Sequence, residues 1–146
     1  MKQISSRFSI AVHVLSLIAV SPDPEQCTGD ILAGSVNTNP VIIRRISAML
    51  KKAGLIEVRA GIGGAKLKVP PEEITLLTVF RAVDSASEGE LFHFHENPNP
   101  ACPVGRNIES ILRAEMRAAQ EAFEARLASV TIRQLMDGLK PHLLEA

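Results

Sequence analysis

The chain has 146 residues, of which 46% are hydrophobic and 22% charged, which suits a soluble protein with one compact domain and an appendage. Five Phe and neither Tyr nor Trp favour helix-on-helix packing and argue against a stacking platform for single-stranded nucleic acid. The net charge is zero, but residues 1–70 carry nine Lys and Arg against four Asp and Glu, and residues 71–146 carry seven against twelve.

A half with a net charge of +5 therefore adjoins a half with a net charge of −5. This asymmetry predicts a polyanion-binding N-terminal half and a C-terminal half with another task, and a chance fluctuation of surface charge is the alternative. The two cysteines, Cys27 and Cys102, are too far apart in sequence to suggest a disulfide framework or a zinc site, so we expect a reducing cytoplasm. The apolar run Ile10–Val20 is too short to span a bilayer, and we expect no membrane segment.

Helix signals and apolar periodicity predict three helices in the first third of the chain. Thr28 and Asn39 are the expected N-caps of the second and third helices, and a turn over residues 35–39 separates the two. The first helix is apolar nearly all round, which suggests that it is wedged between its own domain and a partner chain. The three predicted helices cover Ser6–Val20, Gly29–Gly34 and Pro40–Ala53.

A β-hairpin is predicted next, with strands over residues 55–59 and 65–69 and a glycine-rich tip over residues 60–64. A fourth helix is expected to open at Glu72 and to end at Val83, and residues 84–105 have the composition of a loop. The last two predicted helices are a long one from Arg106 to about Leu127 and a short one from Thr131 to about Leu139.

The order helix, helix, turn, helix, hairpin is that of a winged helix. We therefore predict a mainly α protein with a small β-hairpin wing: a winged helix-turn-helix over residues 1–84, a loop over residues 85–105, and a dimerisation helix with a short C-terminal helix over residues 106–146. The long helix has an apolar stripe that the N-terminal domain need not cover, although folding back onto that domain is the alternative.

A recognition helix buries one face and presents the other to the major groove. Ile43, Ile46 and Leu50 are the predicted inner face, with Arg44 and Arg45 outside and Lys51 and Lys52 one to two turns further on. The alternative to a DNA-binding surface is a solvent-exposed basic helix face beside an ordinary hairpin. The predicted DNA contacts come from the helix-turn-helix and the wing, and they are Thr28, Asn37, Thr38, Asn39, Val41, Arg44, Arg45, Arg59 and Lys66.

Six segments carry a family resemblance: Met1–Arg7, Thr28–Ala33, Pro40–Ile46, Leu50–Ile56, Arg59–Leu67 and Pro71–Thr75. They resemble the Rrf-two family of bacterial winged-helix regulators, relatives of the iron–sulfur cluster regulator. The resemblance implies a homodimeric transcription factor, usually a repressor, that uses residues 37–45 and the wing on double-stranded DNA.

The loop before the long helix departs from the cluster-binding members, which carry three closely spaced cysteines there. This chain has only Cys102, and a [2Fe–2S] cluster needs four ligands. We therefore expect no iron–sulfur cluster, and the chain looks more like the cluster-free branch of the family.

Cys102 is instead a candidate sensor. It lies just before the long helix, where the helix dipole and Arg106 are expected to lower its pKa, and an oxidant or electrophile that modifies it is the hypothetical effector. An inert loop cysteine is the alternative. His93 and His95 are alternate residues of an extended segment and point to opposite sides, so we predict no metal site with Cys102.

The sequence does not favour an enzyme. It has no Gly-rich phosphate loop after a strand, no Ser or Cys nucleophile with an orienting His, and no paired carboxylates in a defined pocket. A winged-helix protein–protein adaptor without specific DNA binding is the alternative function, because the fold alone permits it.

Overall fold

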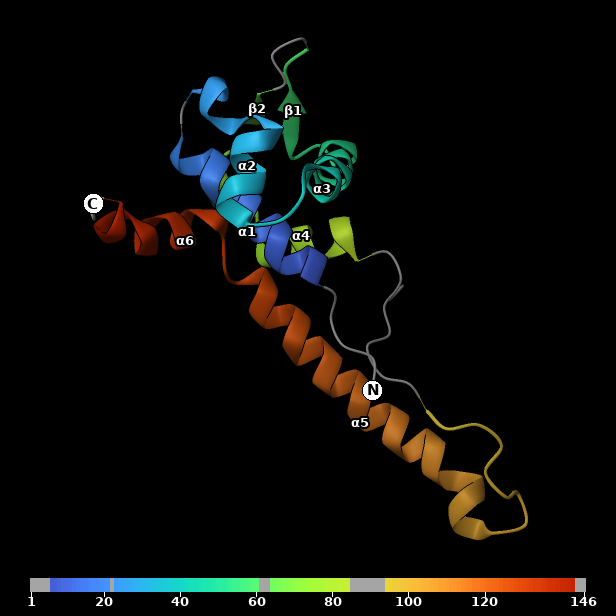
Figure 1. The fold of residues 1–146 in the computed structure, drawn as a ribbon. Coiled ribbons are helices and arrows are strands. Elements are labelled where there is room, and N and C mark those ends of the chain that lie inside the picture. Colours follow the sequence, from blue (N-terminus) through green and yellow to red (C-terminus); the bar gives the residue numbers. More distant parts are fainter. Residues whose placement is uncertain (1–5, 22, 61–63, 85–93, 144–146) are drawn as a thin grey trace.

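The computed structural model describes residues 6–21, 23–60, 64–84 and 94–143. It is mostly helical with one two-stranded antiparallel sheet, and it confirms the predicted fold class (Figure 1). Short 3-10 turns are labelled η. The elements in chain order are α1 Ser6–Val20, η1 Pro24–Cys27, α2 Gly29–Val36, α3 Pro40–Lys52, β1 Ile56–Val58, β2 Ala65–Leu67, η2 Pro71–Glu73, α4 Leu76–Val83, α5 Pro103–Ala128, α6 Ile132–Leu139 and η3 Lys140–His142.

Polar side chains at the helix ends define the helix-turn-helix. The Thr28 hydroxyl accepts a hydrogen bond from the Ile31 N–H at the start of α2, and the Asn39 side chain accepts one from the Ile42 N–H at the start of α3. Asn37, with φ 64°, takes the left-handed conformation that ends α2. The predicted end at Gly34 was therefore two residues too early, because Asn37 and not Gly34 ends the helix.

The wing is a short hairpin in which Ile56 pairs with Leu67 and Val58 with Ala65. Both strands are shorter than predicted, although the Lys68 N–H still bonds the Leu55 carbonyl at 2.9 Å beyond them. Most of the predicted glycine-rich tip, residues 61–63, lies outside the described residues.

Gly64 fixes the base of this wing against η1. A Cβ at this position would overlap the carbonyl oxygen of Pro24, so the close approach of the two backbones requires glycine. The contact ties the return strand to the segment that precedes the helix-turn-helix.

Helix α1 lies at the centre of the core. Ala11, Val14, Leu15 and Ile18 are buried, and α1 contacts α2, α3, α4, α6 and β2. Its own domain therefore accounts for much of this apolar surface, and a contact with a partner chain through the half-buried remainder stays a prediction. A helix that is apolar nearly all round is covered on several sides, and here elements of its own chain supply much of that cover.

The C-terminal helix α6 returns to this core. Ile132 and Met136 are buried with the residues of α1, and the Ile132 N–H bonds the Ile74 carbonyl at 2.8 Å. Thr131 and Gln134 form a capping box that starts the helix. The packing of the winged helix thus extends across the division predicted at residue 84.

Helix α4 begins at Leu76 and not at Glu72, as predicted from the acidic residues after the two prolines. Residues 71–73 form a 3-10 turn, and Thr75 is the N-cap because its hydroxyl accepts a hydrogen bond from the Thr78 N–H at 3.1 Å. Helix α5 begins three residues before the predicted Arg106, since Pro103 is tolerated in a first turn.

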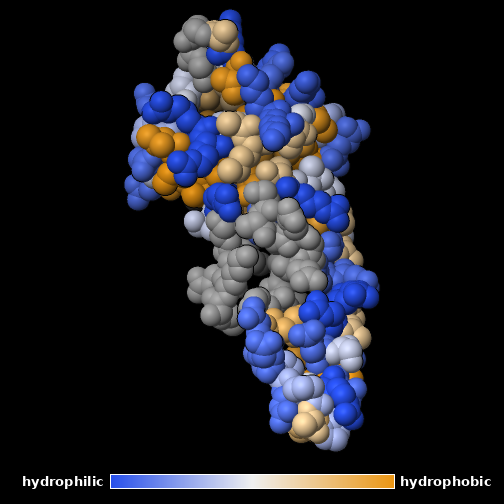
Figure 2. Space-filling model, turned by 90° about the vertical axis from the view of Figure 1, so that its right-hand side faces the viewer, coloured by the Kyte–Doolittle hydropathy of each residue, from blue (hydrophilic) through white to orange (hydrophobic). Residues whose placement is uncertain are grey.

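Helix α5 projects from the body and carries residues 94–102 at its far end (Figure 1). Its base is anchored by Phe123, whose ring meets Phe80 edge-on at 5.7 Å, and Phe80 meets Phe8 of α1 in the same way. Arg81 and Glu124 add an ion pair at 3.4 Å. Figure 2 shows the resulting shape, a broad body with a narrow extension on which hydrophobic patches interrupt a hydrophilic surface. No helix in the described ranges is long and apolar enough to cross a membrane.

Candidate nucleic-acid interface

Helix α3 separates a buried face from a cationic one. Ile43, Ile46 and Leu50 are buried, as predicted. The residues of the opposite face recur every three or four positions and are exposed. Four of them are cations, and within the described residues none of these four is in an ion pair. This exposed face consists of Val41, Arg44, Arg45, Ala48, Lys51 and Lys52. It fits an anionic surface such as a DNA groove.

The predicted site residues around the turn have structural tasks of their own. The Thr28 oxygen caps α2 and the Asn39 oxygen caps α3, while Asn37 supplies the left-handed residue between the helices. Asn39 keeps its amide N–H donors, because capping uses only its oxygen. Thr38 is half-buried, so of these four residues Asn37 and Asn39 are the more exposed.

Arg44 lies back along the first turn of α3. Its Nε donates to the Pro40 carbonyl at 3.4 Å, which leaves the terminal guanidinium N–H groups free for an acceptor in the groove. Arg45 is also exposed, one position further along the helix. Together they place two guanidinium groups near the end of α3 that a helix-turn-helix directs into the groove.

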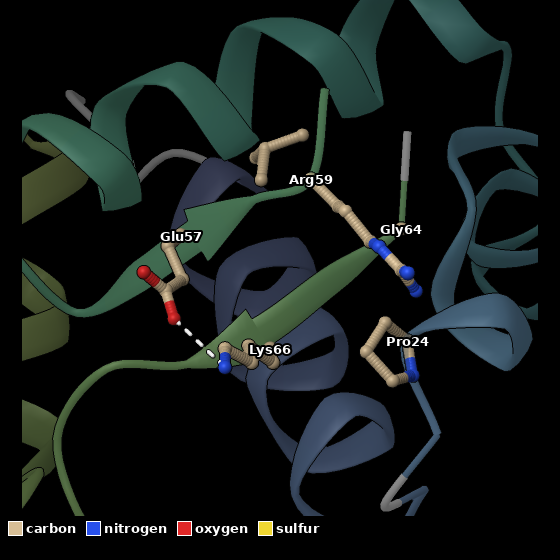
Figure 3. A pocket seen from close by; sticks show the side chains of 6 residues that line it. Pro24, Glu57, Arg59, Gly64 and Lys66 are labelled. Atoms are coloured by element: carbon tan, nitrogen blue, oxygen red, sulfur yellow. Dashed lines mark ion pairs between the residues drawn. The ribbon is translucent and has the colours of Figure 1, made fainter. Parts of the chain in front are cut away.

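The wing contributes Arg59 and Lys66 beside a hollow of about 310 Å³ lined by Pro24, Glu57, Val58, Arg59, Gly64 and Lys66 (Figure 3). In Figure 3 the Arg59 side chain extends past Gly64 toward Pro24. Lys66 Nζ pairs with Glu57 at 3.1 Å, and both side chains are more than half exposed. A pair this exposed contributes little to stability, so Lys66 can exchange its partner for a phosphate.

A second hollow joins α3 to the wing. It has a volume of about 250 Å³ and is lined on the helix side by Arg44, Ser47, Ala48 and Lys51, and on the wing side by Val58 and Ala65. The predicted recognition helix and wing are therefore neighbours on one surface. The prediction did not include Ser47 and Ala48, although Ala48 follows Arg44 by one helical turn and precedes Lys51 by another.

Cys102 is exposed at the N-cap position of α5. Figure 1 shows that this end of α5 lies far from α3 and the hairpin. The Asn99 side chain accepts a hydrogen bond from the Ala101 N–H at 3.0 Å, and the Asn99 carbonyl accepts one from the Cys102 N–H at 3.2 Å. The backbone N–H groups of Gly105 and then Val104 lower the pKa of the Cys102 thiol. The predicted lowering is thus present, but its cause is the first-turn backbone and not the Arg106 side chain.

Cys27 has the opposite environment. It is a fully buried member of the core, and burial raises the pKa of its thiol, although a hydrogen bond with Ser21 partly opposes this. The hydrophobic packing expected of a buried cysteine explains this position.

The comparisons with known proteins agree with this architecture. The family model described as Rrf2, iron-dependent transcriptional regulator, matches residues 4–138. The chain belongs to the Rrf2 family of transcriptional regulators. YwnA of Bacillus subtilis strain 168, named as a candidate HTH-type transcriptional regulator, is 46% identical over 136 residues, which cover 93% of this chain and 98% of YwnA. The predicted Rrf-two resemblance is confirmed.

Solved structures support the same assignment. One described as a candidate DNA-binding protein is 41% identical, with a TM-score of 0.72, and the match covers 90% of this chain and 99% of that one. The oxidised form of CymR from Staphylococcus aureus is 20% identical, with a TM-score of 0.62 and coverage of 92% and 96%, and it shows the shared fold. The Rrf2 relatives are transcriptional regulators rather than enzymes.

The family description mentions iron dependence, and an iron centre would need protein side chains as ligands. Cys102 is exposed at the start of α5, whereas Cys27 is buried in the core of the winged helix. Across the described ranges, no three or more His, Cys, Asp or Glu side chains gather in a way that would hold a metal ion. His93 lies outside those ranges, and His95 is exposed. This donor set does not fit an iron–sulfur cluster.

Proposed function

We propose that this Rrf2 regulator is a homodimeric, sequence-specific DNA-binding repressor that works without an iron–sulfur cluster and is switched by the thiol of Cys102. The observation that carries the DNA-binding part is the exposed cationic face of α3, with Arg59 and Lys66 of the wing on the neighbouring element. Cationic side chains on the helix and on the wing can bind both the phosphates and the base edges of a duplex.

The dimer is supported by the outer part of α5. Val104, Ile108, Ile111 and Leu112 are exposed on a helix that has no buried residue and that projects from the body. The first three follow the spacing of four and three residues that helix pairs use, which favours a second copy as the occupant. A two-fold dimer also supplies the second DNA half-site that one small module lacks.

The switch is supported by the exposure of Cys102 and by the lowered pKa of its thiol. With hydrogen peroxide as oxidant, the thiolate attacks one peroxide oxygen, the O–O bond breaks, an S–O bond forms, and sulfenic acid and hydroxide result. An electrophile would instead alkylate the same sulfur. Either product lies beside the exposed helix proposed to hold the dimer.

DNA footprints of the purified full chain, with and without hydrogen peroxide, test this proposal. We expect a palindromic footprint that is lost at increasing salt and on oxidation, and Cys102→Ser should retain the footprint in peroxide. Cys27→Ala, which keeps the core apolar, is the matched control and should lose its footprint in peroxide as the wild-type chain does. In transcription from a promoter that carries the footprinted site, the unmodified protein should lower the transcript level.

Three parts of the proposal, the switch, the DNA binding and the repression, each have a contrary result. If Cys102→Ser lost its footprint in peroxide at the wild-type rate, Cys102 would not be the switch. Retention on a polyanion column that does not change with salt would favour the adaptor alternative. A rise in transcript level would replace the repressor with an activator.

A further inference from the structure

Exposed apolar side chains divide into groups with different surroundings. Four of the nine large exposed hydrophobic residues among the described ranges lie on the outer part of α5, and Leu139 and Leu143 lie near the C-terminal end. The other three are Ile31, Val41 and Val58 of the helix-turn-helix and wing. Val41 differs from them because it is 55% exposed on the outer face of α3, among the four cations of that face.

The backbone holds Val41 in a defined place. It is the second residue of α3, directly after Pro40, and the Asn39 cap bonds the N–H of the following Ile42. Valine is branched at Cβ, so its side chain has one strongly preferred rotamer in a helix. Its two methyl groups are therefore presented rigidly at the N-terminal end of α3, the end at which recognition helices contact base edges.

The chemistry of Val41 selects its contact. Its side chain has no hydrogen-bonding group for a phosphate or for the polar edge of a base. The apolar group that the major groove offers is the C5-methyl of thymine. Arg44 and Arg45, one turn along the same face, are exposed cations that would hold this face against the duplex.

Ile31 and Val58 have other positions. Ile31 lies in the first turn of α2, and Val58 lines the hollow between α3 and the wing. Neither is on the outer face of the recognition helix. Val41 is consequently the large apolar side chain that this face offers to a base edge.

We propose that Val41 is a specificity-determining residue that packs against the C5-methyl group of a thymine in the major groove. This inference rests on the proposed DNA-binding function and adds the class of base pair that α3 prefers. Arg44 and Arg45 would then recognise neighbouring base pairs or phosphates by hydrogen bonds.

The experiment deletes only the methyl group. The full chain first selects a duplex from a random DNA library, and each thymine of the selected duplex is then replaced by uracil. We expect one position per half-site at which uracil weakens binding about fourfold, which corresponds to about 0.8 kcal/mol for one buried methyl group. Val41→Ala should weaken binding of the thymine duplex and should lose no further affinity when uracil replaces that thymine.

Leu139→Ala is the matched control, because Leu139 is an exposed apolar residue on α6 and not on α3. It should keep the full thymine-to-uracil effect. If no uracil substitution changes affinity, or if Val41→Ala retains the same uracil effect, the inference is overturned while DNA binding stands. If the library yields no enriched sequence, the proposed function and this inference fail together.

Discussion

Cys27 and Cys102 carry the same thiol in opposite surroundings. Cys27 is buried among core residues, and burial raises its pKa, whereas Cys102 is exposed at the start of α5, where the N–H groups of Gly105 and Val104 lower its pKa. The loop geometry explains why a glycine is needed at residue 105. A Cβ there would lie 2.6 Å from the Asn99 carbonyl oxygen, so a larger residue would push the loop off the helix.

This difference predicts the order of cysteine alkylation. A lowered pKa keeps the Cys102 thiolate populated as the pH falls below the usual thiol range, so iodoacetamide should modify Cys102 at a pH where a free cysteine reacts slowly. Cys27 should react only in denaturant. Peptide mass spectrometry across a pH series measures both rates. A Cys102 profile that matches free cysteine would contradict the prediction.

Helix α5 performs two tasks along its length. Its C-terminal part contacts the body through Phe123 and Glu124, and its N-terminal part exposes Val104, Ile108 and Ile111. The Arg113 guanidinium lies 4.5 Å from the centre of the Phe94 ring, so the preceding loop also rests on this helix. The element thus offers an apolar surface far from the core.

Ile111→Lys should weaken the dimer on the order of a hundredfold, because two ammonium groups would be buried in the proposed interface. The matched control is Arg117→Glu, which is exposed and lies about half a turn from the apolar stripe at 3.6 residues per turn. Sedimentation across a concentration series measures the dissociation constant of both variants. A lysine variant that dimerises as tightly as the control would show that this stripe is not the interface.

At the scale of the whole molecule, three phenylalanines connect the body to the extension. Phe8, Phe80 and Phe123 come from α1, α4 and α5 and meet edge to face, with the Arg81–Glu124 pair beside them. These residues determine the direction in which α5 leaves the winged helix. The spacing of the two DNA-binding domains in the proposed dimer would therefore depend on them.

Phe123→Ala should lower the free energy of unfolding by about 2 kcal/mol, less than the loss for a fully buried ring because Phe123 is half-buried. Phe94→Ala, which removes the loop ring that rests on Arg113 in the outer part of α5, should cost under about 1 kcal/mol. Urea denaturation followed by circular dichroism compares the two. Equal losses would mean that the phenylalanine cluster does not anchor α5.

The sequence by itself determined the local elements and the outer face of α3. Thr28, Asn39 and Pro40 act on backbone groups a few residues away, so their positions predicted where α2 and α3 begin. The helical repeat of Ile43, Ile46 and Leu50 likewise predicted which side Arg44 and Arg45 occupy.

Only the tertiary structure decided what depends on contacts between distant segments. It buried α1 within its own domain, returned α6 to that core, and paired Lys66 with Glu57 through the register of the hairpin. It also showed that Gly64 rests against Pro24 and that α3 and the wing share one hollow. Such contacts depend on how whole elements pack, and local propensity and periodicity carry no information about them.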